Sequence, residues 1–134
     1  MIRQAKLEDL PQLCLLESQC FANEPWNMQQ LQSHLQHAAA YIAVLQEQPV
    51  AYVLFYQSLD YIEIYRIGVL ADYRRNGLAS QLLDVTAETT TRIILEVEEN
   101  NHAALAFYLS QGFVVTSQRK DYYATGTALL LARG

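Results

Sequence analysis

The spacing of apolar residues predicts two helices near the N-terminus. Over residues 10–21, apolar side chains recur every three or four positions, which is the period of an amphipathic helix, and Pro11 is tolerated in a first turn. Asp9 precedes this segment and is predicted to cap it. A second helix is predicted after Asn27, because Asn27 and Gln30 have the spacing of a capping box.

The segments that follow have the apolar pattern of strands. Residues 41–45, 50–56 and 61–69 are separated by short polar turns, so they are predicted to pair as an antiparallel meander. The pattern becomes helical over 78–87 and then indicates a buried strand over 92–97. Because a strand, a helix and a further strand in one sheet normally form a right-handed crossover, the two strands that flank this helix are expected to be parallel.

The C-terminal third continues the alternation of helix and strand. Residues 103–111 have the pattern of a helix that ends at Gly112, and 113–120 and 127–132 are predicted to be strands. The chain is therefore predicted to be one mixed α/β domain over residues 1–134, with about six to seven strands in a central sheet and four helices on both of its faces. The sheet is expected to be antiparallel early and parallel in the middle.

Composition and charge exclude several classes of protein. The chain has 134 residues, of which 51% are hydrophobic, so it can form one core, and no low-complexity stretch marks a linker. Its formal net charge of -5 argues against a nucleic-acid-binding protein, which needs a dense basic surface. The N-terminus lacks the apolar region of a secretory signal, and no apolar run is long enough to span a membrane. We therefore expect a cytoplasmic protein without membrane contact.

Neither the cysteines nor the histidines are predicted to form a cross-link or a metal site. Cys14 and Cys20 are six positions apart on one predicted helix, too far for a disulfide, and are expected to be free, buried thiols. His34 and His37 have a spacing that could hold a metal, but no acid or cysteine lies near them in the sequence. We therefore assign no metal.

The turn from Arg74 to Ala79 has the composition of an anion-binding site. A helix that starts after a strand directs unpaired N–H groups and its positive dipole end at the space above the turn. Gly77 permits a positive φ and the close approach of a ligand, while Arg74 and Arg75 add charge, so a diphosphate would suit the turn. The alternative is an ordinary helix start with two solvated arginines.

Several motifs together resemble the GNAT superfamily of N-acetyltransferases. Arg74, Gly77 and Ala79 match its coenzyme A motif, Q/R-x-x-G-x-G/A after a strand. The stretches EPWN, RIGVL, LEVEENNHAALAFYLSQGF and RKDYY resemble its RimI-like branch, whose members acetylate the N-terminal alanine of a small-subunit ribosomal protein. The resemblance covers nearly the whole chain. It implies a GNAT fold, acetyl-CoA as the cofactor and the N-terminus of that ribosomal protein as the acceptor.

The resemblance implies two catalytic residues. Acetyl transfer from a thioester to an amine needs a neutral amine, a stabilised carbonyl oxygen and a proton for the departing thiolate. Glu96, near the end of strand 92–97, would be the general base, and Tyr108 would protonate the thiolate, because a phenol with a pKa of about 10 is mostly protonated. The alternatives are a solvated strand-end acid for Glu96 and a core residue for Tyr108. Phe107 is assigned to the core.

The remaining cofactor contacts also follow from the resemblance. In the superfamily the strand equivalent to 61–69 diverges from its parallel neighbour, and the pantetheine arm pairs with the exposed backbone. The Val69 N–H would be the oxyanion donor, a role in which one donor contributes about 2.7 to 4 kcal/mol. Asn101 would touch the pantetheine arm, although it could equally cap the helix that follows. The predicted cofactor site consists of Ile67, Gly68, Val69, Arg74, Arg75, Asn76, Gly77, Leu78, Ala79, Ser80 and Asn101.

The acceptor site is predicted between the first interhelical loop and the end of the chain. Pro25 and Trp26 lie where the superfamily builds its acceptor pocket, although Trp26 could instead close the core. Tyr122 and Tyr123 resemble the terminal tyrosines of the branch and are expected to line the acceptor cleft.

The class of the acceptor is left open by the sequence. Glu98 and Glu99 could favour a cationic peptide, or they could form a solvated strand end. Two other functions are compatible with the motifs. One is a GNAT acetyltransferase that acts on a small-molecule amine, and the other is a non-catalytic module that binds acyl-CoA.

The third predicted helix departs from the branch. The segment between the glycine turn and strand 92–97 is several residues shorter than usual, so this helix is expected to be short. Thr86 and residues Thr89 to Thr91 are poor helix formers, and its C-terminal end is therefore predicted to fray or turn early.

Overall fold

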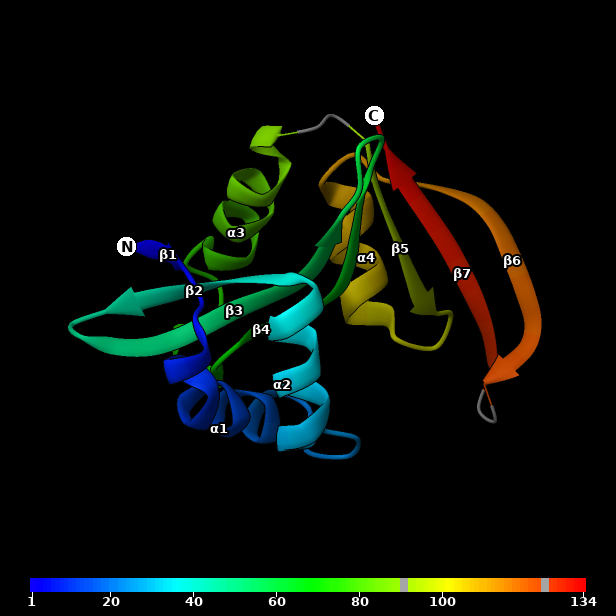
Figure 1. Cartoon of the computed structure of the whole chain (residues 1–134). Helices are drawn as coiled ribbons and strands as arrows, with labels where there is room; N and C mark the ends of the chain where they lie inside the picture. Colours follow the sequence, from blue (N-terminus) through cyan, green and yellow to red (C-terminus); the bar gives the residue numbers. More distant parts are fainter. Residues whose placement is uncertain (90–91, 124–125) are drawn as a thin grey trace.

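The computed structural model describes residues 1–89, 92–123 and 126–134, which fold into one sheet with helices on both faces (Figure 1). The strands are β1 (Ile2–Gln4), β2 (Ala39–Leu45), β3 (Gln48–Gln57), β4 (Ile62–Val69), β5 (Ile93–Glu98), β6 (Val114–Tyr123) and β7 (Gly126–Arg133). The α-helices are α1 (Leu10–Cys20), α2 (Met28–His37), α3 (Leu78–Thr86) and α4 (His102–Ser110). Short 3₁₀ turns are η1 (Leu7–Asp9), η2 (Ala71–Tyr73) and η3 (Ala87–Thr89).

The sheet has seven strands in the order β1-β2-β3-β4-β5-β7-β6. Strands β4 and β5 are parallel, and the other neighbouring pairs are antiparallel. The mixed sheet, its parallel central pair and the helices on both faces confirm the predicted fold class. Two features were not predicted: β1 pairs with β2 at one edge, and β7 inserts between β5 and β6.

Strands β4 and β5 separate after a short stretch of pairing. Their ladder runs from Ile62 opposite Ile93 to Ile64 opposite Leu95. Beyond that point β4 continues to Val69 and β5 continues to Glu98, and these described segments no longer pair with each other. The divergence implied by the family resemblance is therefore present, and it leaves a gap in the middle of the sheet.

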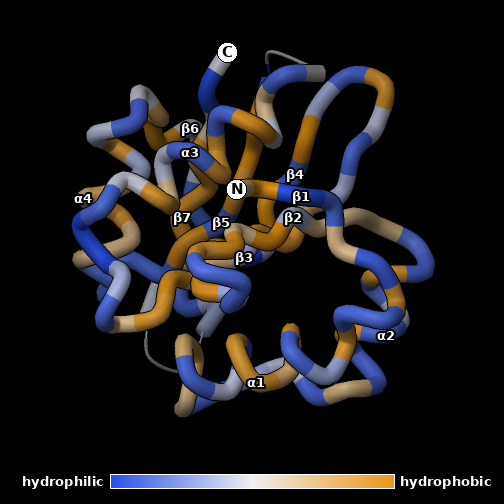
Figure 2. The backbone as a smooth tube through the Cα atoms, turned by 90° about the vertical axis from the view of Figure 1, so that its left-hand side faces the viewer, coloured by the Kyte–Doolittle hydropathy of each residue, from blue (hydrophilic) through white to orange (hydrophobic). Residues whose placement is uncertain are grey.

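The sheet separates two apolar cores. Figure 2 shows apolar segments concentrated in the central strands, between the helices. Helices α3 and α4 cover one face, where Leu82 and Leu83 pack with Ile93 and Phe113. Helices α1 and α2 cover the other face. The buried residues of that second core are Leu13, Leu16, Leu31, Ala40, Ile42, Tyr52 and Leu54.

The first two helices begin close to the predicted positions, but one capping residue acts differently. Asn27 and Gln30 form the predicted capping box, with two reciprocal hydrogen bonds of 2.8 Å. Asp9 precedes α1, yet its carboxylate does not cap that helix. It accepts a hydrogen bond of 2.8 Å from the Lys6 N–H and forms an ion pair with Arg3. The hydrogen bond from Arg3 lowers the pKa of Asp9 below its usual range.

The third helix is short and turns early, as predicted. Helix α3 has nine residues and ends at Thr86, whose hydroxyl donates a 2.7 Å hydrogen bond to the Leu82 carbonyl. The 3₁₀ turn η3 follows directly. Thr90 and Thr91, which were also expected to disfavour helix, lie outside the described residues. At the end of α4, Gly112 has a φ of 91° and is the predicted C-terminal glycine.

Cys14 and Cys20 are both free but only half-buried, so the prediction of buried thiols was wrong. The buried positions of α1 are taken by Leu13, Leu16 and Glu17, which leaves the cysteines at the margin of the apolar face. Partial burial raises the pKa of both thiols. Within residues 1–89, 92–123 and 126–134, no helix is long and apolar enough to cross a membrane, and no three metal-ligating side chains gather.

Candidate active site

The register of β3 and β4 determines which backbone groups face the gap. The Leu70 N–H donates a 2.9 Å hydrogen bond to the Val50 carbonyl. Since amide groups alternate between the two sides of a strand, those of Gly68 also point toward β3. The N–H and C=O groups of Ile67 and Val69 then point the other way, toward the gap left by β5. This arrangement leaves the backbone groups expected to meet the pantetheine arm without a strand partner.

A β-bulge at Tyr65 controls which side chains of β4 face α1 and α2. The β3–β4 ladder skips Tyr65. As a result Tyr65 and its neighbour Arg66 lie on the same face of the sheet. The Tyr65 ring lies 6.1 Å from the Trp26 ring, and the Arg66 guanidinium lies 4.3 Å from the centre of the Phe21 ring. The bulge thus directs two large side chains toward the loop between α1 and α2.

The turn before α3 has the backbone geometry of an anion site. Gly77 is the N-cap of α3 with a φ of 77°, and Arg75 has a φ of 67°. The first N–H groups of the helix, from Leu78 to Ser80, have no acceptor within it. A Cβ on Gly77 would meet only the Gln81 side chain, at 4.0 Å. The glycine is therefore needed for its left-handed conformation rather than for space.

Three polar side chains of this turn and of the start of α3 form hydrogen bonds with neighbouring parts of the protein. The Nε of Arg74 donates a 3.0 Å hydrogen bond to the Val69 carbonyl, which places the guanidinium at the end of β4 on the side of the gap. The other hydrogen bonds join the Asn76 side chain to the Tyr73 carbonyl at 3.2 Å and the Ser80 hydroxyl to Gln111 at 3.1 Å. The turn thus holds an arginine beside the backbone amides.

Glu96 lies on the face of β5 opposite the α3/α4 core. Its neighbours Leu95 and Val97 belong to that core, so the alternation of a strand directs Glu96 and Glu98 to the other face. The Arg119 Nε lies 3.9 Å from the Glu96 Oε1. That oxygen is buried and accepts no hydrogen bond within the described part of the chain. A carboxylate oxygen that accepts no hydrogen bond from the protein can accept a proton from a ligand.

Tyr108 is 7% exposed and belongs to the α3/α4 core. Its ring packs edge-to-face against Phe107 and Phe113, with centroids 5.2 and 5.4 Å away. Burial raises the pKa of the Tyr108 phenol, which therefore stays protonated over the ordinary pH range. Tyr108 and Glu96 therefore lie on opposite faces of the sheet. Phe107, which was assigned to the core, packs against the same core and is half-buried.

Asn101 caps α4, which was one of the two predicted roles. Its side-chain oxygen accepts a 3.3 Å hydrogen bond from the Ala104 N–H. The cap uses the oxygen and leaves the side-chain NH₂ group for another partner.

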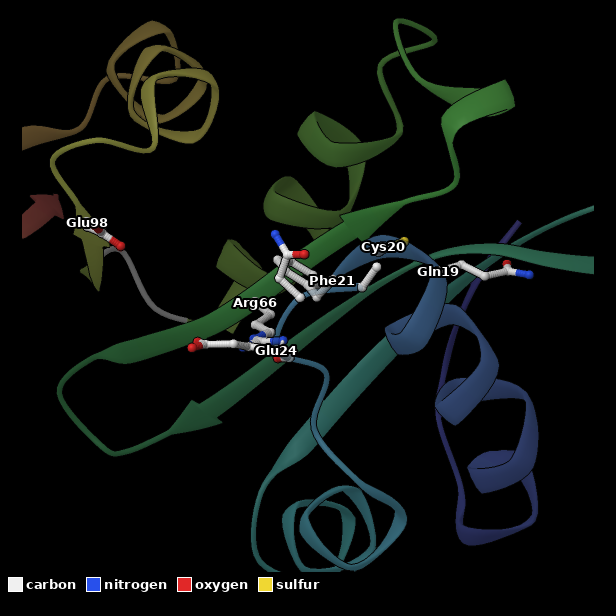
Figure 3. A pocket seen from close by; sticks show the side chains of 8 residues that line it. Gln19, Cys20, Phe21, Glu24, Arg66 and Glu98 are labelled. Atoms are coloured by element: carbon white, nitrogen blue, oxygen red, sulfur yellow. Dashed lines mark hydrogen bonds between the residues drawn. The ribbon is translucent and has the colours of Figure 1, made fainter. Parts of the chain in front are cut away.

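A pocket of about 650 Å³ opens where the loop between α1 and α2 faces β4 and β5. In Figure 3, Glu24 and Arg66 lie side by side, and Glu98 faces them from β5. The pocket is lined by Gln19, Cys20, Phe21, Ala22, Asn23, Glu24, Arg66 and Glu98. Its walls come from the end of α1, the loop that follows it and the two strands that border the gap.

The predicted acceptor residues of the loop lie beside this pocket rather than in it. Pro25 is exposed. The Trp26 ring contacts His34 and Tyr65 in a neighbouring pocket between α2 and the β3–β4 strands. Trp26 also packs against the α1/α2 core, which agrees in part with the alternative that it closes the core.

The terminal tyrosines gather near Glu96, at the end of β6. The Tyr122 and Tyr123 rings are 5.3 Å apart, and the Arg119 guanidinium lies 5.3 Å from the Tyr122 ring. Burial and then the charge of Glu96 raise the pKa of Tyr123. The structure thus brings the predicted base and both predicted acceptor tyrosines together.

Sequence reasoning missed Glu17, which is completely buried on α1. The Tyr52 hydroxyl donates to one of its oxygens at 2.5 Å, and the Trp26 N–H donates to the other at 2.6 Å. Arg66 forms an ion pair with it. The only signal in the sequence was an acid four positions after Leu13 on the apolar face of the helix.

The chain matches the model of the Acetyltransferase (GNAT) family over residues 7–113. It is 39% identical over 72 residues to the ribosomal protein bS18-alanine N-acetyltransferase of Salmonella typhimurium, an alignment that covers 50% of this chain and 49% of that protein. The chain spans about half the length of the curated relatives it matches.

Solved structures match the whole fold. The ribosomal-protein-S18-alanine N-acetyltransferase from Escherichia coli superimposes with a TM-score of 0.89 at 26% identity, covering 99% of this chain and 92% of that one. Arabidopsis thaliana Naa50 in complex with the bisubstrate analogue CoA-Ac-MVNAL has a TM-score of 0.80 at 21% identity, covering 99% and 98%. At that identity the second likeness establishes the fold alone.

Proposed function

The chain belongs to the acetyltransferase (GNAT) family, and from this premise we propose that it transfers the acetyl group of acetyl-CoA to the N-terminal α-amino group of a protein. The proposed acceptor is the N-terminal alanine of a small-subunit ribosomal protein, in keeping with the activity named for the Salmonella relative. The observation that carries the proposal is that β4 and β5 stop pairing, next to a turn whose backbone has the geometry of an anion site.

The residues present fit coenzyme A. The pyrophosphate would be held by backbone N–H groups at the start of α3, with Arg74 and Arg75 adding positive charge. The pantetheine arm would pair with the backbone of Ile67 and Val69, as an added strand does, and with the side-chain NH₂ group of Asn101. The N–H groups of the turn belong to Asn76, Gly77, Leu78, Ala79 and Ser80. The Naa50 structure, which has the same fold, contains a CoA-linked analogue.

In the proposed reaction Glu96 takes the proton of the acceptor ammonium. Bound acetyl-CoA supplies the acetyl thioester. An α-amino group has a pKa of about 7.7 to 8.0, so its deprotonation near neutral pH is a modest step for one carboxylate, directly or through a water molecule. The Glu96 Oε1, which is buried and accepts no hydrogen bond from the described residues, supports this role.

Two further groups act on the reacting carbonyl and on the leaving group. The Val69 N–H faces the gap and would donate a hydrogen bond to the thioester oxygen as negative charge develops there. As the amine nitrogen bonds to the carbonyl carbon and the C–S bond breaks, Tyr108 would donate its phenolic proton to the departing sulfur. The nitrogen loses its second proton as the amide forms, and this proton would balance the one that Tyr108 gives up. The raised pKa of Tyr108 supports a donor that is protonated before transfer begins.

The acceptor chain would enter through the pocket beside the loop between α1 and α2. Pro25 and Trp26 would border its entrance, and Tyr122 and Tyr123 would line the opposite wall. Glu24 and Glu98 give this pocket a carboxylate on each side. That charge favours a cationic N-terminus over an acidic one.

The test is mass spectrometry of peptides and small amines incubated with the protein and acetyl-CoA. We expect one added acetyl group on the α-amino group of peptides that begin with alanine, and little on polyamines or amino acids. Acetylation of small amines alone would favour a small-molecule acetyltransferase. Coenzyme A binding without transfer to any acceptor would favour a non-catalytic module.

A further inference from the structure

We propose that Glu17 is a positioning residue that holds the acceptor loop, residues 21–27 between α1 and α2, against β4. Glu17 is on α1, outside the loop, and is 0% exposed. It acts through hydrogen bonds rather than by touching the acceptor. The hydrogen bonds and the ion pair of Glu17 support this positioning role by themselves. Its consequence for catalysis rests on the proposed function.

Within the described residues, two hydrogen bonds join the Glu24–Trp26 segment of the loop to α1 and β4, and both involve Glu17 or its ion-pair partner Arg66. The Trp26 N–H donates to the Glu17 Oε2 at 2.6 Å. Arg66 on β4 forms an ion pair with the same oxygen and also donates a 3.1 Å hydrogen bond to the Glu24 carbonyl. The Glu17 carboxylate therefore holds both ends of the Glu24–Trp26 segment. It binds the Trp26 end directly and the Glu24 end through Arg66.

The network is fixed on its far side by the sheet. The Tyr52 hydroxyl on β3 donates to the Glu17 Oε1. Burial, followed by the hydrogen bond to Glu17, raises the pKa of Tyr52, so this hydroxyl remains a donor. The Tyr52 ring lies directly over Gly68. The carboxylate thus connects α1, β3 and β4 with the acceptor loop at a single point.

Stability alone does not account for such a network. A buried ion pair can often be replaced by apolar side chains of similar volume with little loss of stability, because burying two charges costs as much as their attraction returns. Apolar replacements could fill the space of Glu17 and Arg66. They could not accept the hydrogen bond of the Trp26 N–H or donate one to the Glu24 carbonyl. The groups that need these particular side chains are backbone groups of the loop.

The position of the loop matters because it forms one wall of the proposed acceptor pocket. Phe21 and Glu24 line that pocket, and Arg66 borders it from β4. If the Glu24–Trp26 segment moves, the pocket changes shape, while the amide groups of β4 and α3 that would hold acetyl-CoA stay in place. Loss of Glu17 should therefore impair use of the acceptor and spare the binding of acetyl-CoA.

The experiment is amide hydrogen exchange measured by NMR on the full chain and its variants. The variants are Glu17→Gln, which keeps the shape of the side chain, Tyr52→Phe, and the double replacement Glu17→Leu with Arg66→Met. Tyr41→Phe on β2 is the matched control, because Tyr41 packs on Phe55 away from the loop. The Leu70 amide, bonded to the Val50 carbonyl, reports whether the sheet is intact.

In the double variant we expect exchange of the Trp26 amide to be at least about tenfold faster, because a hydrogen bond to a charged acceptor is lost. The Leu70 amide should exchange as in the wild type. Glu17→Gln and Tyr52→Phe should each give a smaller acceleration in the same direction. Tyr41→Phe should give none. The proposal is wrong if the Trp26 amide stays protected in Glu17→Gln and in a folded double variant.

Kinetics provide the second readout. We expect the KM for the acceptor peptide to rise several-fold in Glu17→Gln, with the KM for acetyl-CoA within about twofold of the wild type, since only the acceptor wall moves. An equal rise in both KM values would indicate a general structural defect and contradict the proposal. If the wild type acetylates no amine, the proposed function fails, and the exchange data still decide the role of Glu17.

Discussion

The ring of Tyr52 occupies the space that a side chain on Gly68 would need. A Cβ at Gly68 would lie 2.6 Å from the Tyr52 Cε1 and 2.9 Å from its hydroxyl oxygen. Tyr52 is fully buried and donates to Glu17, so its ring cannot move aside without breaking that hydrogen bond. The β4 glycine that the family resemblance assigns to the cofactor thus also accommodates a core tyrosine of β3.

This contact predicts the effect of Gly68→Ala. The added methyl group should destabilise the protein by roughly 1 to 3 kcal/mol, the usual cost of overpacking a core. In a Tyr52→Leu background the same change should cost clearly less, because the clashing ring is gone. Urea unfolding of the two single variants and the double variant measures the coupling. Strictly additive free energies would show that the ring is not the cause.

Glu96→Gln tests the proposed base. The amide cannot take the acceptor proton, so kcat should fall by about 10² to 10⁴. Affinity for coenzyme A should be unchanged, because Glu96 lies on the face of the sheet opposite α3 and is not among the groups proposed to hold the cofactor. Steady-state kinetics and calorimetry measure the two quantities, with Glu47→Gln on the β2–β3 turn as the control. A loss of less than about tenfold in kcat would rule out the assigned role.

Tyr108→Phe tests the proposed acid and has a pH signature. Burial raises the pKa of Tyr108 above that of an ordinary tyrosine. The wild-type kcat should therefore show no decline from loss of this proton until the pH is above about 10. Tyr108→Phe should lower kcat at every pH and leave coenzyme A affinity intact. A Tyr108→Phe enzyme as fast as Tyr41→Phe would mean that another group protonates the thiolate.

His34 predicts a pH dependence of stability. Burial lowers the pKa of His34 from its ordinary value of 6.5, with partial opposition from its hydrogen bond to the Ala39 carbonyl. As the pH falls below 6.5, the unfolded chain takes up a proton at His34 while the folded protein resists it. The free energy of unfolding therefore decreases as the pH falls from 6.5 toward the lower pKa of the folded protein.

The variant His34→Gln isolates this effect. The free energy of unfolding of the wild type relative to His34→Gln should fall as the pH is lowered from about 8 to about 5. His37→Gln, at an exposed position on the same helix, is the control. A difference between wild type and His34→Gln that is constant over this range would contradict the shifted pKa.

Local pattern predicted most of the fold, and nonlocal contacts account for what it missed. The helices and six of the strands follow from apolar periodicity, and the parallel pair follows from the handedness of crossovers. Strand β1 has only three residues, too few to show a period. The insertion of β7 between β5 and β6 depends on pairing between distant segments, which periodicity does not encode.

The contrast between local pattern and nonlocal contacts also applies to the site. The glycine turn before α3 and the end of β5 at Glu96 are local motifs, and both were recognised in the sequence. Glu17 and Arg66 are 49 positions apart, so neither could be identified as the partner of the other before folding. Phe107 and Tyr108 are adjacent aromatics on one helix. Which of the two faces the core depends on how α4 packs on the sheet, and the structure buries Tyr108 more deeply.

The central claim is that amide groups at the end of β4 and the start of α3 hold acetyl-CoA. The most direct measurement is an NMR titration of acetyl-CoA into the isotopically labelled protein. We predict that the amides of Ile67 and Val69 and those from Asn76 to Ser80 shift together and saturate at one equivalent. Titration to large excess without movement of these amides would contradict the account.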